Sequence, residues 1–350
     1  MSRLQDTIKY PDYIARRKFT ISPGGFSAAL SQMNSDHPVF LYDKDGRLRR
    51  LAENIEPGFL KIPQSPGLKE LLFPPRKMVV STDVLEKDIV ICGVRNCELR
   101  SKHFLDLVFT GNTVFDKSYS GRAKKLKMIT FDCASPASSC FCIQTGGSSF
   151  NDPSETSFLN VTRIEENRLL ITTGPDFSNE YMKYFDFTAA DEKDTHTAAE
   201  IKEHSDAYVG NSMHSRAVFD LISILKENNN LPDLSKIEKD IESCISCGGC
   251  TFICPTCYSF ALADSSSVQQ PKTFQQWDSC QYPGYSDFMN NKFTRLKRFI
   301  YRYRCKLGFM MDNNGTSGCT GCGRCIETCP AGIDMRTIIE KIVEYMKKQR

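Results

Sequence analysis

The first half of the chain alternates short apolar runs with polar loops, which indicates strands separated by turns and short helices. Runs of strand length stand at residues 39–42, 89–91, 125–131, 158–163 and 168–173. Asp45-Gly46 and Glu165-Glu166-Asn167 are turn sequences within this series, and each predicts a hairpin. A helical pattern at 99–109 follows the second run. Residues 1–188 therefore predict a mixed α/β domain.

The second half lacks this alternation and predicts helices. Residues 189–235 form a charged helical connector with an amphipathic pattern at 215–225. A closing helix is expected over 333–348, where one stripe is apolar. The chain is thus expected to be α+β, with a mixed α/β domain (1–188), a connector (189–235) and a largely helical domain (236–350).

Composition sets limits on the class of protein. A chain of 350 residues exceeds the size of one typical core, which supports two domains. The net charge of +3 is too small to indicate a nucleic-acid or membrane-surface partner. The N-terminus lacks the apolar core of a signal peptide, and no run approaches the ~18 apolar residues of a membrane helix. We expect a soluble, cytoplasmic protein without a membrane span.

Eight of the sixteen cysteines stand in two copies of one motif, C-x2-C-x2-C-x3-C-P, at residues 244–255 and 319–330. With this spacing one loop presents three thiolates to a [4Fe–4S] cluster, and the fourth cysteine ligates the other cluster of a two-cluster domain. The motif therefore assigns two cluster sets, which are Cys244, Cys247, Cys250 and Cys329 for the first and Cys319, Cys322, Cys325 and Cys254 for the second.

Zinc is the alternative occupant of such cysteines. Structural zinc prefers two separated pairs of ligands, whereas here three cysteines fall within seven residues and are followed by Cys-Pro, twice. The glycines of the loops, among them Gly248 and Gly321, suit backbone wrapped closely around a cluster. Iron–sulfur is therefore favoured, and free thiolate ligands imply a reducing compartment.

The long link between the motifs, residues 255–318, bears on the kind of iron–sulfur domain. It contains helical patterns, chiefly at 292–307, and few β-branched runs. These features favour an α-helical ferredoxin-type domain over the compact β-sheeted type.

Four further cysteines, Cys97, Cys133, Cys140 and Cys142, lie in polar loops that follow the strands at 89–91 and 125–131. If these strands are parallel neighbours, both loops open at one edge of the sheet and the four thiols can converge. The arrangement then predicts a third cluster, another [4Fe–4S]. Scattered buried cysteine is the competing interpretation, because cysteine is often buried. Spacing alone leaves both open.

The segment 292–306 carries seven cations and no acid. Cations near a reduced, anionic cluster stabilise it, and a basic face can also dock an acidic redox partner. Nucleic-acid binding is disfavoured because the rest of the chain supplies no basic field. Arg324, inside the second motif, is the residue expected to tune a cluster potential.

Motifs of substrate-converting enzymes are absent from the sequence. No G-x-G-x-x-G opens a helix after a strand, and there is no P-loop, H-E-x-x-H or G-x-S-x-G. We expect no active site of the chain's own, so that electrons arrive from and leave to other polypeptides.

From about residue 68 onward the chain resembles the iron–sulfur A subunit of anaerobic sulfite reductases and the related beta subunit of soluble NiFe sulfhydrogenases. The resemblance rests on residues 71–75, 93–100, 133 and 140–142, and on both cluster motifs. The segment 276–287, with its Trp-Asp-Ser-Cys, looks like the sulfite-reductase branch. Residues 1–65 match neither branch closely.

The resemblance implies an electron-transfer subunit between a flavin subunit that oxidises NAD(P)H and a catalytic subunit. That catalytic subunit would be a sirohaem sulfite reductase or, alternatively, a NiFe hydrogenase. Cys97, Cys133, Cys140 and Cys142 match the family pattern one by one, which strengthens the prediction of a third cluster.

Overall fold

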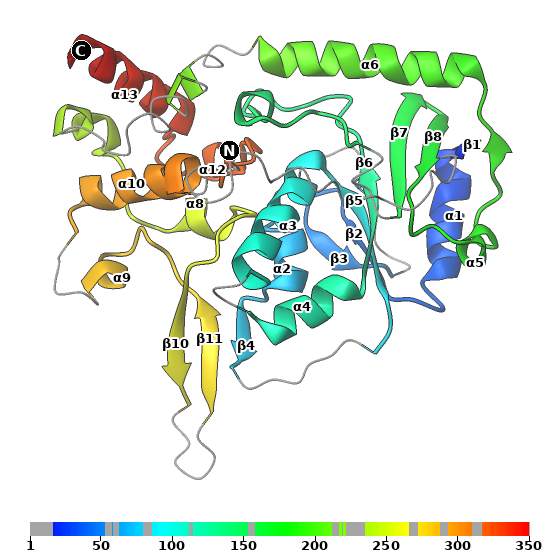
Figure 1. Cartoon of the computed structure of the whole chain (residues 1–350), viewed down its shortest axis with the longest axis horizontal. Coiled ribbons are helices and arrows are strands. Elements are labelled where there is room, and N and C mark those ends of the chain that lie inside the picture. The colour runs from blue at the N-terminus through cyan, green and yellow to red at the C-terminus, as the bar shows by residue number, and fades with distance from the viewer. Residues whose placement is uncertain are drawn as a thin grey trace, which may run out of the picture.

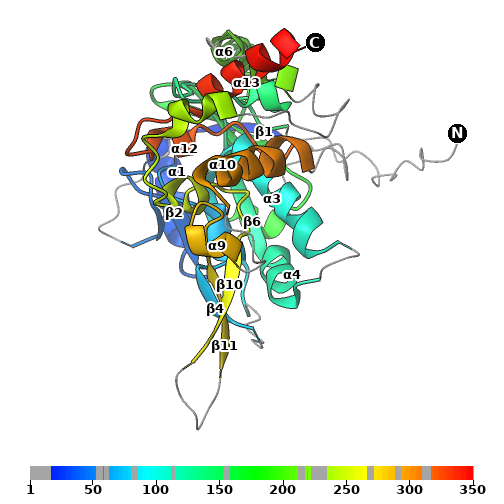
Figure 2. The ribbon, with the colours of Figure 1, turned by 90° about the vertical axis from the view of Figure 1, so that its left-hand side faces the viewer.

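The computed structural model describes residues 17–52, 58, 63–79, 86–111, 115–152, 158–211, 217–218, 220–221, 235–265, 272–287, 293–309 and 317–349. A large sheet with helices on both faces forms one part, and short helices carrying the two motifs form the other (Figure 1). A β-hairpin extends away from both parts (Figures 1 and 2).

The large sheet has eight strands in the order β3-β2-β5-β6-β7-β8-β1-β9. The strands β2, β5, β6 and β7 run parallel, and the other pairs are antiparallel. Both hairpins predicted from the sequence, β2–β3 and β7–β8, are confirmed. The strand bounds are β1 Lys18–Ile21, β2 Val39–Tyr42, β3 Leu48–Arg50, β5 Ile89–Val94, β6 Leu126–Phe131, β7 Leu159–Glu165, β8 Arg168–Thr173 and β9 Thr188–Ala189.

Helices cover both faces of this sheet. Because side chains alternate along a strand, Val90 and Cys92 of β5 pack with α1 (Pro23–Met33), while Ile91 packs with α2 (Leu68–Leu72) and α3 (Asn96–Phe109). Val94 lies on the same face as Ile91 because a β-bulge between Cys92 and Val94 shifts the alternation by one residue. The helix α4 (Lys117–Lys124) lies with α2 and α3, and α5 (Asn179–Met182) contributes to the core on the α1 side. Parallel strands buried on both faces read as continuous apolar runs, which is why β5 and β6 were evident in the sequence.

The helix α6 (Glu192–Gly210) packs along the first domain, although its composition resembles that of a solvated connector. The Ser205 hydroxyl donates to the carbonyl of Cys133 at 2.6 Å, and the Gln144 amide donates to the carbonyl of Val209 at 2.8 Å. Asp206 accepts from the Ser149 backbone N–H at 2.8 Å. The polar loop after β6 is therefore held by α6. The helix expected at 215–225 falls largely outside the described residues.

The second part contains the short helices around the motifs and a core of its own. Apolar side chains of α10 and α13, such as Phe299, Ile339 and Ile342, form this core, and the predicted closing helix is confirmed as α13. The bounds are α8 Gly249–Phe252, α9 Pro283–Asp287, α10 Arg295–Tyr303, α12 Arg324–Glu327 and α13 Met335–Gln349, with a π-helix at Arg304–Phe309 and 3₁₀ turns at Ile143–Thr145, Ser235–Ile237 and Lys239–Ile241.

The link between the motifs, for which helical segments were expected, contains helices α9 and α10 but also a β-hairpin. Strands β10 (Phe260–Asp264) and β11 (Thr273–Trp277) form a hairpin there, and β4 (Arg76–Met78) of the first domain pairs with β11. No residue of β10 is buried, and Ala and Leu, which fill three of its five positions, are not strand formers. The strand β10 is therefore held by its pairing with β11 rather than by a strong strand propensity of its own. No helix among the described residues is long and apolar enough to cross a membrane.

Candidate iron–sulfur centres

The two motif loops adopt the same backbone conformation. Gly248 and Gly323 stand at equivalent positions with φ of 73° and 71°, and each precedes a short helix, α8 or α12. Ser246 and Gly321 are also equivalent, with φ of 56° and 65°. Such left-handed positions turn the chain tightly around the space in front of the three cysteines.

Each loop faces a cavity lined by the four cysteines that motif spacing groups together. Cys244, Cys247, Cys250 and Cys329 line the first cavity, together with Cys325 of the second motif. Cys254, Cys319, Cys322 and Cys325 line the second. The fold therefore brings the fourth cysteine of each motif to the cavity of the other motif.

The loop that carries Cys140 and Cys142 packs directly on the second motif. The Phe141 N–H donates to the carbonyl of Gly321 at 2.8 Å, and the Cys140 sulfur lies 4.0 Å from the carbonyl of Cys322. A Cβ on Gly321 would stand 2.4 Å from the Phe141 carbonyl oxygen, and one on Gly323 would stand 2.5 Å from the Ser139 hydroxyl. Only glycine permits this close approach.

The four cysteines of the first domain gather at one edge of the sheet. β5 and β6 are parallel neighbours, which is the condition for the four thiols to converge, so Cys97 and Cys133 follow their carboxyl ends at the same edge. Burial raises the pKa of Cys97, Cys140 and Cys142, and the nearby Cys133 sulfur raises each further. Arg95 donates to the carbonyl of Asp132 at 2.8 Å and so ties the two strand ends together.

The buried thiols suit metal binding because they resist ionisation on their own. Burial raises the pKa of Cys140, Cys142 and Cys319 to about 12. A coordinated metal deprotonates such a thiol outright, so binding is coupled to release of protons. Among the described residues no three His, Cys, Asp or Glu side chains lie close enough to hold one metal ion. The four cysteines of a cubane cluster need not meet that condition, because each binds a different iron.

Two buried cations stand at these cavities. Arg302 lines both cavities, and Lys306 lines the second. Arg302 donates to the carbonyl of Cys250 at 2.9 Å, and Lys306 donates to the carbonyl of Thr256 at 3.0 Å. Burial opposes both charges, but the sulfurs around them, Cys254 and Cys257 among them, outweigh it and raise the pKa of each cation.

Within the described part of the chain, neither cation makes an ion pair with a carboxylate; their hydrogen-bonding neighbours are sulfur, backbone oxygen and the Thr256 hydroxyl. A buried charge without a counter-charge is costly. An iron–sulfur cube with its thiolates is a net anion and would supply the missing charge. The residues present therefore fit clusters in both cavities.

Arg324 lies behind the second loop rather than in a cavity. Its guanidinium is 3.2 Å from the Glu98 carboxylate and donates to the carbonyl of Ser65 at 3.0 Å. Its charge also offsets the burial that raises the pKa of Cys97 and Cys322. Arg324 thus stands between the second cluster set and the cysteines of the first domain.

Sequence reasoning identified the basic segment but not which of its cations face the cysteines. Arg302 and Lys306 are four residues apart, which places them on one face of a helix, and Cys305 stands beside Lys306. This spacing was the signal in the sequence that could have identified the two cations. Nothing in the sequence indicated that Lys69 is a buried cation beside the first motif. It donates to the carbonyl of Phe252 at 3.0 Å and lies 3.9 Å above the Trp277 ring, and burial lowers its pKa to about 8.

Residues 243–333 match a protein family described as a 4Fe–4S dicluster domain. Over 292 residues the chain is 27% identical to Sulfhydrogenase 2 subunit beta of Pyrococcus furiosus, a match that covers 78% of this chain and 84% of that protein. No solved structure gives a significant match. The chain is therefore homologous to a sulfhydrogenase beta subunit over most of its length, and its dicluster domain indicates [4Fe–4S] clusters and electron transfer.

Proposed function

We propose that the chain is the electron-transfer subunit of a cytoplasmic oxidoreductase complex and passes electrons through a line of three [4Fe–4S] clusters. One observation carries this proposal. The two cysteine-lined cavities lie side by side, sharing Cys325 and Arg302, and the second motif is in backbone contact with the Cys140–Cys142 loop. Each cluster supplies a one-electron step, and the protein sets its potential by burial, hydrogen bonds and nearby charge.

The order of the cysteine sets follows from their contacts. The cysteines of the first domain adjoin the second set, and the second set adjoins the first. The loop of the first motif reaches the surface, because Ile245 is 69% exposed and Cys247 is exposed. In our proposal electrons enter at one end of this line and leave at the other.

The partners are inferred from the relative and from the resemblance. A flavin subunit that oxidises NAD(P)H would exchange electrons with one end of the line, and a catalytic subunit with the other. The curated relative is a sulfhydrogenase subunit, which favours a hydrogenase as the catalytic partner.

An anaerobic sulfite reductase is the second candidate for the catalytic partner, on the basis of the segment 276–287. In the structure this segment braces the first motif. The Ser279 hydroxyl donates to the Thr251 hydroxyl at 3.1 Å, and a Cβ on Gly248 would stand 3.0 Å from the Ser279 side chain. Because the segment serves a cluster loop, it does not discriminate between the two catalytic partners.

Anaerobically purified protein tests the relay. We expect iron and acid-labile sulfide in equal amounts, with EPR of interacting cubane clusters after dithionite reduction. Cys247→Ser and Cys322→Ser should each remove one of two different cubane signals. Zinc in place of iron, or clusters that no reductant reduces, would contradict the proposal.

The third cluster has a test of its own. Cys140→Ser combined with Cys142→Ser should lower the iron content by about four atoms per chain while the signals lost in Cys247→Ser and Cys322→Ser remain. Unchanged iron would assign these four cysteines to the buried core. Co-purification of nickel or of sirohaem with the complex distinguishes the two catalytic partners.

A further inference from the structure

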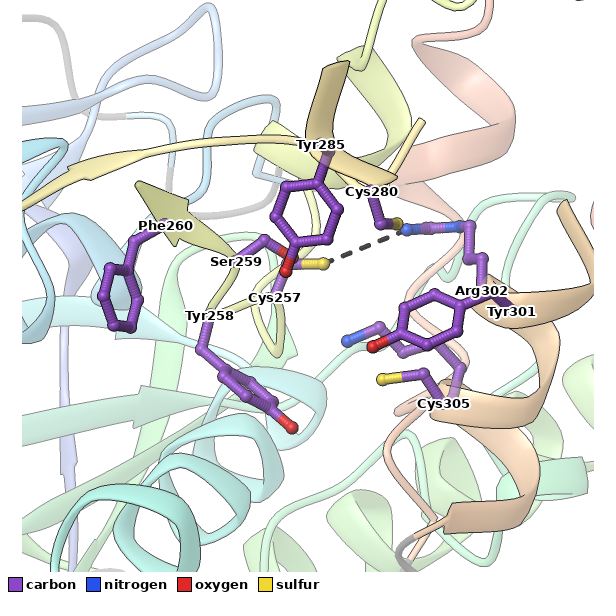
Figure 3. Close-up of a pocket in the computed structure, with 10 residues that line it drawn as sticks. Cys257, Tyr258, Ser259, Phe260, Cys280, Tyr285, Tyr301, Arg302 and Cys305 are labelled. Carbon is purple, nitrogen blue, oxygen red and sulfur yellow. Dashed lines mark hydrogen bonds between the residues drawn. The ribbon is translucent and has the colours of Figure 1, made fainter. Parts of the chain in front are cut away.

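Three cysteines outside the sets described above line a third cavity. Cys257, Cys280 and Cys305 surround a space of about 240 Å³, and Figure 3 shows their side chains directed into it. By the same measure the two cavities lined by the motif cysteines hold about 50 and 20 Å³. This third cavity has more room than either space proposed for a cubane.

The three thiols come from separate segments. Cys257 follows the first motif, Cys280 follows β11, and Cys305 lies in the π-helix Arg304–Phe309 that continues α10. π-helical turns are rare and are found mostly at functional sites. Here the π-helix presents Cys305 and Lys306 to the same space.

Two of the sulfurs have N–H groups directed at them. The Gln281 amide donates to the Cys280 sulfur at 3.4 Å, and the Arg302 guanidinium lies 3.9 Å from the Cys257 sulfur. N–H groups directed at sulfur are among the features that orient and stabilise metal-bound thiolates. The Cys257 backbone N–H donates to the carbonyl of Cys254 at 3.2 Å, so a group bound at Cys257 would adjoin the second cluster.

The lining of the cavity is electropositive. It includes Arg302 and Lys306, and no carboxylate is among the described residues that line it. Its remaining polar groups are three tyrosines and one serine, Tyr258, Tyr285, Tyr301 and Ser259. Thiolates in such a surrounding gain charge compensation, and a cluster held by them is a net anion.

We propose that this cavity holds a further iron–sulfur cluster, bound by Cys257, Cys280 and Cys305. Three cysteines leave one iron of a cubane without a protein thiolate, and that iron can bind a small exogenous ligand. The tyrosines that border the cavity, together with Phe260 at its edge (Figure 3), would limit the size of that ligand.

Iron analysis of the intact, anaerobically purified chain tests the proposal. The triple variant Cys257→Ser, Cys280→Ser and Cys305→Ser should contain about four irons fewer per chain than the wild type. Cys92→Ser is the matched control, because Cys92 is buried in the core beside α1 and lines none of the three cavities. The control should keep the full iron content, and an equal iron content in the triple variant and the wild type would overturn the proposal.

A ligand test uses the unaltered protein and does not depend on whether the triple variant folds. Cyanide added to the reduced wild type should shift the EPR signal of one cluster and leave the signals assigned through Cys247→Ser and Cys322→Ser unchanged. Cys305→Ser alone, at a partly exposed position, should abolish or alter the cyanide-sensitive signal. No cyanide-sensitive cluster in the wild type would overturn the proposal.

The proposal rests on the proposed function only in taking the chain as an iron–sulfur protein. A wild type that lacks iron would end both proposals. If the motif clusters are present and reducible but the triple variant keeps its full iron content, only the proposal of a cluster at Cys257, Cys280 and Cys305 fails.

Discussion

The Arg324 guanidinium lies 3.2 Å from the Glu98 carboxylate, and both side chains are almost completely buried. Glu98 also accepts hydrogen bonds from the Tyr42 hydroxyl and, at 3.2 Å, from the Arg95 backbone N–H. Arg324 opens α12 in the second motif, whereas Glu98 lies in the first turn of α3 beside Cys97. One buried ion pair thus links the second motif to the helix that carries Cys97.

Arg324→Ala should destabilise the protein by roughly 3–5 kcal/mol, because it leaves the Glu98 carboxylate buried without its cation. Anaerobic denaturant unfolding measures the loss. Lys347→Ala is the control, since the Lys347 side chain is 60% exposed in its pair with Asp220 and the pair should contribute no more than about 1 kcal/mol. An equal effect of both substitutions would contradict this account. EPR-monitored redox titration of Arg324→Ala also tests its expected tuning role, which an unchanged midpoint would refute.

Arg302→Gln should lower the midpoint potentials of the clusters bound by both motifs. Arg302 lines both cavities, and loss of a cation next to an anion disfavours the reduced, more negative state. An interaction of about 1 kcal/mol corresponds to roughly 40 mV for one electron. Redox titration followed by EPR measures the change.

Two variants control for the role of charge at position 302. Arg302→Lys keeps the positive charge, so its midpoint potentials should lie close to those of the wild type. Lys297→Gln removes an exposed cation from the same helix, α10, and should change little. The prediction fails if Lys297→Gln has the larger effect.

Gly321→Ala should detach the Cys140–Cys142 loop from the second motif. The new Cβ would stand 2.4 Å from the Phe141 carbonyl oxygen and 2.6 Å from the Cys142 Cα, so the two loops must separate. Iron content and thermal unfolding should both decrease relative to the wild type. At the equivalent position of the first motif, Ser246 adopts φ of 56°, so this backbone conformation does not by itself require glycine, whereas the close approach of Phe141 at Gly321 does.

Gly332→Ala separates crowding from backbone strain. Gly332 has φ of 64°, like Gly321, but nothing lies within 4 Å of its Cβ position. The Gly332→Ala variant should lose only the free energy of unfolding that the strained backbone costs, about 1–2 kcal/mol, and it should keep its iron. If Gly321→Ala behaves no worse than Gly332→Ala, the contact with Phe141 is unimportant.

Removal of iron by a chelator should loosen the two motif loops and leave the large sheet intact. Without clusters, Arg302 and Lys306 lose the anionic partners inferred for them, whereas the sheet has its own apolar cores on both faces. Hydrogen exchange should rise in residues 244–254 and 317–329 and stay low in β5 and β6. A uniform rise over the whole chain would show that the clusters hold the entire fold.

Local sequence was enough to predict the strands β5 and β6, both hairpins of the large sheet and the closing helix α13, whereas the parallel pairing of β5 with β6 came from the structure. Those elements have strong periodicity or turn residues, and each buries the face that its pattern marks. Motif spacing also predicts that each fourth cysteine ligates the cluster of the other motif, and in the structure each of these cysteines lines the other motif's cavity. The hairpin β10–β11 could not be predicted from the sequence, since β10 has no buried face that would create an alternating pattern.

The sequence by itself determined which cysteines group within the two motifs, because ligand spacing is a local property of the chain. Only the tertiary structure decided what surrounds them. It turned Arg302 and Lys306 of the basic segment toward the cysteines, paired Arg324 with Glu98, and placed Cys257, Cys280 and Cys305 around one cavity. These neighbours lie far apart in the chain, and it is packing between segments, not local propensity, that brings them together.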